Sequence, residues 1–241
     1  MVHTTKDYSS RYRQDVVYGN IDSAEQSARQ NINSFYDRRG TVIWFDGFEA
    51  ANDNHWSLGG DAGGTKALTT TKAWMGNQSM LMTTPGVAGQ FANLNKAFSA
   101  PFNYRMGAEV MMREGDNDPR VSLLILGYSG TYVYRGTLRF NFATDVLDYR
   151  NSAGGYTALT VVDSYNTDQE QWIPIKLVVD WTTGYYVRAF FGGTEYDLST
   201  IPLYATASAV LPRVHCQIYT EATLAAASTM YYDNFIFTQN E

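Results

Sequence analysis

A succession of short strand-like segments is the feature that most constrains the fold of this chain. From residue 41 onward, apolar and alternating runs recur, and Gly, Asn, Asp and Pro interrupt them. The clearest runs are SMLMTT, RMGAEVMMR, VSLLILGY, TYVYRGTLRFNF, YTALTVV, WIPIKLVVDW, YYVRAFF, RVHCQIYT and MYYDNFIFT. No fixed-period repeat or low-complexity linker separates them. We therefore predict one all-β domain over 41–241, built as a sandwich or barrel.

The composition agrees with an all-β class and limits the kinds of partner that the chain can bind. The 18 Tyr and 20 Gly suit strands and turns better than helices. A formal net charge of −6 provides no basic field for nucleic acid or an anionic membrane surface. The first residues lack the apolar run of a secretory signal, and nowhere do 18 consecutive apolar residues occur. We expect a chain without a visible signal peptide, a nucleic-acid partner or a membrane partner.

Two of the strand-like runs allow more specific predictions. In KLVVDWTTGYYVRAFF, turn-forming residues between Asp180 and Gly184 join two strands into a hairpin. In RVHCQIY, Val214, Cys216 and Ile218 alternate onto one face. We interpret Cys216, the only cysteine, as a small core residue, with a reactive thiol as the alternative.

Residues 1–40 differ from the rest and form a predicted N-terminal arm. The segment from 23 to 37 has apolar residues at spacings of three and four, and Gly40 follows as a helix stop. An isolated helix of this length is marginal in water, so it must dock on its own domain or on a neighbouring subunit. We interpret the arm as an assembly device whose apolar anchors are Val16, Val17, Ile32 and Phe35.

Three segments together resemble one superfamily. The opening strand FDGFE with Trp56 after it, the hairpin IPIKLVVDWTTGYYVRAFFGG and the closing strand YYDNFIF look like the concanavalin A-like lectin/glucanase sandwiches, which include laminin-G-like modules. The resemblance implies a two-sheet antiparallel jelly roll whose first and last strands are neighbours. Glycosidases, polysaccharide lyases, lectins, adhesion modules and virion proteins share this fold, so the site must decide the function.

No catalytic signature is visible. Retaining glucanases of this fold resemble one another in an E-x-D-x-E strand, which aims two carboxylates from one face. In GAEVMMREGD, Glu109 and Glu114 are five residues apart and fall on opposite faces of a regular strand. Three scattered histidines do not form a metal-ligand spacing, and GYSG at 127–130 is a turn. We predict a non-enzymatic protein, with an atypical glycoside hydrolase or polysaccharide lyase as the alternative.

Candidate glycan contacts are aromatic residues in polar surroundings. Sugar binding needs aromatic faces beside hydrogen-bonding side chains. Trp56 and Trp74 lie in loop-rich segments, and Tyr128, Tyr132 and Tyr134 surround a turn. The alternative is that these residues pack inside an aromatic-rich sandwich.

The resemblance also implies a structural calcium site in a chain that requires no cofactor. In several jelly-roll carbohydrate modules a Glu closing the first strand and an Asp in the last strand bind calcium, and oxygen ligands suit that ion. Glu49 and Asp233 occupy comparable positions here. The alternative is hydrogen bonding of these carboxylates to nearby loops.

The main functional hypothesis is a structural or interaction protein of a virion, such as a capsid-decorating or head-fibre component. In this hypothesis the arm binds other protein subunits, and the sandwich decorates the particle. The alternative is a carbohydrate-binding module for glycan or host-surface attachment, located on a virion or at a cell surface.

Overall fold

The computed structural model describes residues 39–98, 104–162 and 171–241, which contain strands and no helix. The strands are β1 Thr41–Asp46, β2 Ser57–Gly60, β3 Thr65–Thr69, β4 Ser79–Thr83, β5 Phe91–Phe98, β6 Arg105–Asp116, β7 Arg120–Tyr128, β8 Tyr132–Asn141, β9 Val146–Arg150, β10 Tyr156–Val161, β11 Ile173–Asp180, β12 Tyr185–Phe191, β13 Thr194–Asp197, β14 Tyr204–Ala207, β15 Arg213–Glu221 and β16 Thr229–Gln239. In these ranges no helix long and apolar enough to cross a membrane occurs. The predicted helix at 23–37 and the arm anchors Val16, Val17, Ile32 and Phe35 lie outside the described residues.

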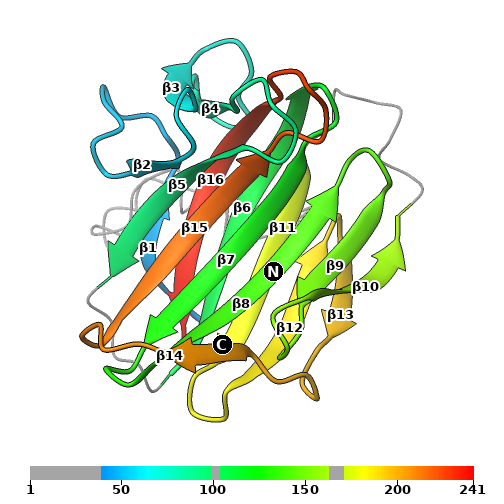
Figure 1. Ribbon diagram of the computed structural model, residues 1–241. Helices are drawn as coiled ribbons and strands as arrows, with labels where there is room; N and C mark the ends of the chain where they lie inside the picture. The colour runs from blue at the N-terminus through cyan, green and yellow to red at the C-terminus, as the bar shows by residue number, and fades with distance from the viewer. Residues whose placement is uncertain (1–38, 99–103, 163–170) are drawn as a thin grey trace, which may run out of the picture. The chain divides into compact units, whose positions relative to one another are not determined.

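The strands form two antiparallel sheets stacked face to face (Figure 1). Sheet A has the order β13-β12-β11-β6-β16-β4-β3, with β1 paired to β16. Sheet B has the order β10-β9-β8-β7-β15-β5-β2, with β14 paired to β8, and faces the viewer in Figure 1. The predicted two-sheet jelly roll is confirmed, and so is the pairing of the first strand with the last. From Arg39 to Glu241 the chain forms one compact unit.

Alternation along each strand determines which residues fill the core. In β15, Val214, Cys216 and Ile218 point inward and are fully buried. The intervening residues of β15 therefore point outward from sheet B. Burial raises the pKa of the Cys216 thiol, which disfavours the thiolate. Cys216 is therefore the core residue that the sequence predicts.

The predicted hairpin is also present, because β11 pairs with β12 and residues 181–184 form the turn between them. Asp180 Oδ1 accepts hydrogen bonds from the backbone N–H groups of Thr182 (2.9 Å) and Thr183 (3.3 Å). Gly184 has a φ of 75°, a left-handed conformation that glycine adopts without a Cβ clash. The turn residues thus supply the geometry that the strands require.

Candidate functional site

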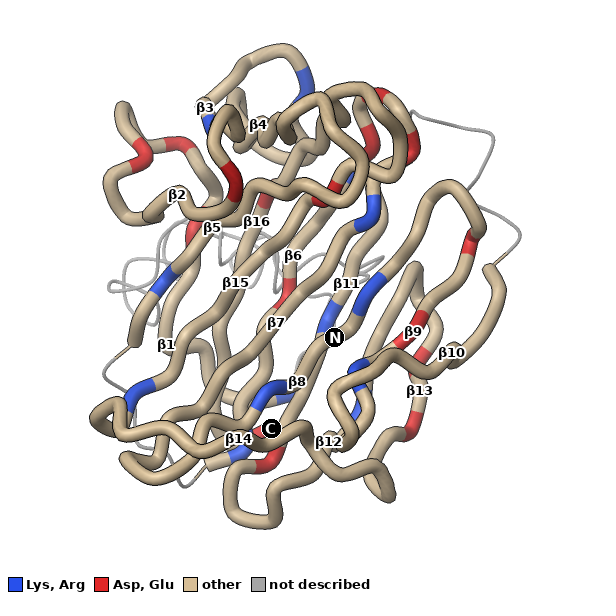
Figure 2. Tube along the Cα trace, viewed as in Figure 1, with Lys and Arg blue, Asp and Glu red and all other residues tan. Residues whose placement is uncertain are grey.

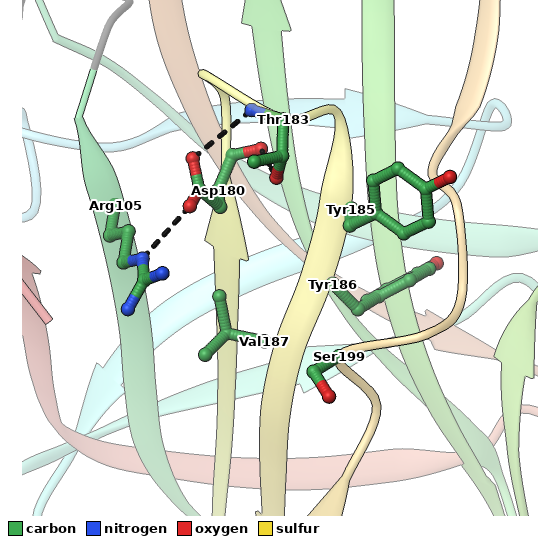
Figure 3. Close-up of a pocket in the computed structure, with 7 residues that line it drawn as sticks. All are labelled: Arg105, Asp180, Thr183, Tyr185, Tyr186, Val187 and Ser199. Carbon is green, nitrogen blue, oxygen red and sulfur yellow. Dashed lines mark hydrogen bonds and ion pairs between the residues drawn. The ribbon is translucent and has the colours of Figure 1, made fainter.

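A pocket of about 250 Å³ lies beside the β11–β12 hairpin (Figure 3). Its polar lining includes Arg105, Asp180 and Tyr186. Asp180 Oδ2 accepts from Arg105 Nε at 2.8 Å, and its other oxygen accepts from the turn N–H groups. The Tyr186 hydroxyl is buried and donates to the Arg150 carbonyl at 2.8 Å. The protein itself therefore occupies the main polar groups of this pocket.

The outer face of sheet B carries a connected set of polar side chains. Strand pairing brings Asn93 and Asn95 of β5 beside Tyr219 and Gln217 of β15. Tyr219 OH donates to Gln217 Oε1 at 3.3 Å, and Gln217 Nε2 donates to Asn95 Oδ1 at 2.6 Å. Asn93 Nδ2 donates to the same Asn95 oxygen at 3.1 Å. We call these four residues the amide network.

Aromatic rings lie beside the amide network on the same face. The Phe91 ring lies 4.9 Å from the Tyr219 ring, measured between centroids. Toward the other end of β15, the Tyr128 ring meets the His215 ring edge-on at 5.3 Å. Leu124 and Leu126 of β7 and Val133 of β8 form a small apolar cluster, with Tyr128 and Tyr219 packed against it. The face therefore combines ring surfaces with paired hydrogen-bonding groups.

The strand register arranges this face in rows that cross several strands. One row runs through Asn93, Tyr219, Ser122, Arg139 and Asp148 on β5, β15, β7, β8 and β9. At about 4.8 Å between neighbouring strands, five strands span about 19 Å. Within this row Tyr219 and Arg139 are half-buried, whereas Asn93, Ser122 and Asp148 are buried. An extended chain molecule would therefore reach the row through Tyr219 and Arg139. In Figure 2, Lys and Arg segments lie along β8 and its neighbours in this sheet.

Burial fixes the charge states on the face near neutral pH. Desolvation, followed by the charge of Arg213, lowers the pKa of His215, which favours the neutral imidazole. His215 Nε2 is buried and has no hydrogen-bond partner among the described residues. Desolvation raises the pKa of Tyr219, which keeps its hydroxyl protonated and able to donate. The face therefore offers uncharged donors and acceptors next to arginine side chains.

The predicted glycan-contact residues do not gather at one place. Trp56 is 2% exposed and belongs to the core, so its ring is not available to stack on a sugar. Trp74 lies between β3 and β4, and its backbone N–H donates to Asp233 Oδ2. Tyr134 packs against the core, and Tyr132 is exposed at the start of β8. Only Tyr128 lies beside the face described above.

Sequence reasoning missed the amide network and the arginines of sheet B. The signal was present in RVHCQIYTE, because the residues that alternate with Val214, Cys216 and Ile218 must face the other way. These include His215, Gln217 and Tyr219. Their partners on β5 and β8 required the strand order, which the sequence does not give.

Glu49 and Asp233 both bind the backbone of the β3–β4 connection. Glu49 Oε1 accepts from the N–H groups of Asn77 and Gln78 at 2.8 Å each. Asp233 Oδ2 accepts from Trp74 N at 2.7 Å and Met75 N at 3.1 Å. N–H groups cannot ligate a cation, and the described residues contain no cluster of three or more His, Cys, Asp or Glu that could hold a metal. The geometry fits loop hydrogen bonding better than calcium binding, and the calcium site remains a prediction that a calcium titration of thermal stability can test.

The two glutamates of β6 face opposite ways, as the spacing predicts. Glu109 lies opposite Ile236 of β16, and its carboxylate is 3.7 Å from the Lys176 ammonium. Glu114 is two residues from the core residue Met112 and therefore lies on the same face of the strand as Met112. The β6 segment therefore does not form the carboxylate pair of the glucanases.

Burial and the neighbouring Asp118 raise the pKa of Glu114 from 4.5 to about 7, so the folded protein favours its protonated form. We expect the contribution of Glu114 to the free energy of unfolding to fall by up to about 3 kcal/mol as the pH rises from about 5 to 8. Glu114→Gln should remove this pH dependence and stabilise the fold at the higher pH. Urea unfolding at both pH values tests this, with Glu195→Gln, at a half-exposed side chain, as the control. Equal pH dependence in the wild type and in Glu114→Gln would contradict it.

The comparisons with known proteins establish the fold and no closer relationship. No family model matches this chain, and no curated protein matches it. The structure is similar to an endo-β-1,4-glucuronan lyase from the fungus Trichoderma reesei, with a TM-score of 0.59 and 10% identity over 82% of this chain and 95% of that one. It is also similar to the cellulose induced protein Cip1, with a TM-score of 0.55 and 15% identity over 81% and 96% of the two chains.

A galectin-like protein of unknown function from Bacillus subtilis is similar as well. Its TM-score is 0.55, with 10% identity over 83% of this chain and 96% of that one. These likenesses support a two-sheet jelly-roll β-sandwich fold for the chain. At such low identity they show the fold alone.

Proposed function

We propose that this protein binds carbohydrate through the outer face of sheet B. The observation that carries the proposal is the amide network beside the Phe91 and Tyr219 rings. Amide side chains both donate and accept hydrogen bonds, as sugar hydroxyl groups do. Aromatic rings provide flat apolar surfaces on which the C–H face of a sugar can pack.

The placement of these groups favours binding of an extended glycan. The residues lie on β15 and β5, each of which pairs with a strand on both sides, so little ordering is needed when a ligand binds. Tyr219 on β15 and Arg139 on β8 are half-buried and lie on either side of β7, so they offer contacts to more than one sugar unit.

Tyr219→Ala should weaken glycan binding by roughly tenfold or more, because it removes one stacking surface and one network donor. Calorimetric titration with a panel of neutral and acidic polysaccharides measures the effect in the full chain. Tyr185→Ala is the matched control, because Tyr185 is 40% exposed and lies on β12 of the other sheet. Absence of binding to every glycan at millimolar concentration would overturn the proposal. So would equal binding by Tyr219→Ala and the wild type.

We further propose that binding occurs without catalysis, since β6 lacks the carboxylate pair of the glucanases. A named fold neighbour is a lyase, so the panel should also be assayed for reducing ends and for unsaturated products. Release of either product by the wild type, and not by Tyr219→Ala, would assign an enzyme instead. The virion-assembly hypothesis depends on an arm outside the described residues, and the comparisons give it no support.

A further inference from the structure

Five side chains at one side of the same face form an alternating stack of arginines and tyrosines. The Arg139 guanidinium lies 3.5 Å from the Tyr156 ring centroid, and Arg150 lies 5.9 Å from the same centroid. Arg150 also lies 4.5 Å from the Tyr204 ring centroid, and Arg135 lies 5.5 Å from it. We call Arg139, Tyr156, Arg150, Tyr204 and Arg135 the arginine–tyrosine stack.

Among the described residues, an acid neutralises only one of the three arginines. Asp148 binds Arg139 through both oxygens, at 2.8 Å to Nε and 2.5 Å to Nη2. Arg135 and Arg150 form no ion pair with the described residues, and Arg150 Nε is buried without a hydrogen-bond partner there. The stack therefore carries excess positive charge in a chain whose net charge is −6.

Stacking on a ring prepares a guanidinium group to bind an anion. The ring covers the flat face of the group, while the N–H donors remain in its plane. Those donors form a fixed fork that matches the two oxygens of a carboxylate or sulfate. A lysine would not offer the same geometry, because its ammonium is a point charge.

The stack is continuous with the face that we assign to glycan binding. Arg139 lies in the row that contains Tyr219 and Asn93. Arg135 lies in a second row with Leu126 and His215. A glycan on the amide network would therefore extend toward the unpaired arginines.

We propose that the arginine–tyrosine stack binds the acidic groups of an anionic polysaccharide, either the carboxylates of uronic acids or sulfate esters. This inference rests on the proposed glycan binding and names the class of glycan. It assigns Arg135 and Arg150 as the anion contacts, with Tyr156 and Tyr204 holding their guanidinium planes.

The test measures binding of polygalacturonate, dextran sulfate and neutral dextran to the full chain and its variants. Arg150→Gln and Arg135→Gln should each weaken binding of the preferred polyanion by roughly tenfold or more. Their binding of a neutral glycan should not change. Arg150→Lys should give an intermediate loss, because it keeps the charge and loses the fork. Preference for polygalacturonate assigns carboxylates, and preference for dextran sulfate assigns sulfates.

Lys72→Gln is the matched control, because Lys72 also lies over a tyrosine ring, 5.0 Å from the Tyr231 centroid on the side of sheet A. It removes the same charge and should leave polyanion binding unchanged. Polyanion binding that survives both arginine substitutions, or that Lys72→Gln weakens equally, would overturn the inference. Neutral glycans that bind through Tyr219 with no preference for acids would overturn this inference alone. Failure of all glycans to bind would overturn the proposed function itself.

Discussion

Replacing Trp56 by alanine should lower the free energy of unfolding by about 3–5 kcal/mol. The Trp56 side chain is buried, and its ring lies 5.4 Å from the Trp44 centroid and 5.0 Å from the Phe235 centroid. Its Nε1–H donates to Asp46 Oδ2 at 2.9 Å, while Asp46 Oδ1 accepts from Phe48 N at 2.8 Å. Truncation would leave a large cavity and an unsatisfied carboxylate oxygen.

Urea unfolding followed by far-ultraviolet circular dichroism measures this loss. Trp56→Phe is the matched control, because it keeps most ring contacts and loses only the bond to Asp46. We expect Trp56→Phe to lower the free energy of unfolding by about 1–2 kcal/mol. A Trp56→Ala protein that keeps its stability and loses only glycan binding would contradict the placement of Trp56 in the core. It would support instead the sequence-based prediction that Trp56 contacts a glycan.

Glu241→Gln should destabilise the fold by about 3 kcal/mol, because it removes one charge from a buried ion-pair network. The Glu241 side chain is completely buried, and its Oε1 lies 2.8 Å from Lys176 Nζ. Its Oε2 accepts a hydrogen bond from Arg188 Nη2. A neutral amide would remove the negative charge that lies nearest to these two cations.

Glu195→Gln is the matched control for this prediction. Glu195 also faces Arg188, but at 3.9 Å and with a half-exposed side chain. Surface ion pairs of this kind contribute about 0–1 kcal/mol, so we expect little change. Thermal and urea unfolding compare the two variants. Similar small losses in both would show that the Glu241 network does not stabilise the fold.

The prediction for Trp56 also shows where sequence patterns mislead. The polar letters of NDNHWSLGG suggest an exposed ring, and His55 beside it is indeed exposed. Burial changes from one residue to the next in the loop between β1 and β2, because Asp46 and the paired strands β1 and β16 hold the Trp56 indole inward. A short polar segment therefore does not determine the exposure of a single aromatic residue within it.

The sequence by itself determined the features that depend on neighbours along the chain. Alternation with a period of two predicted the strands, the inward direction of Cys216 and the opposite faces of Glu109 and Glu114. Turn-forming residues predicted the β11–β12 hairpin, and the end strands indicated the jelly roll. Each of these follows from local backbone geometry, which adjacent side chains control.

Only the tertiary structure decided the candidate site. Asn95 and Gln217 are 122 residues apart and share a hydrogen bond. Tyr204 completes the arginine–tyrosine stack because β14 pairs with β8. The strand order follows from the packing of both sheets around one core, and no local pattern encodes which outward-facing residues that packing makes neighbours.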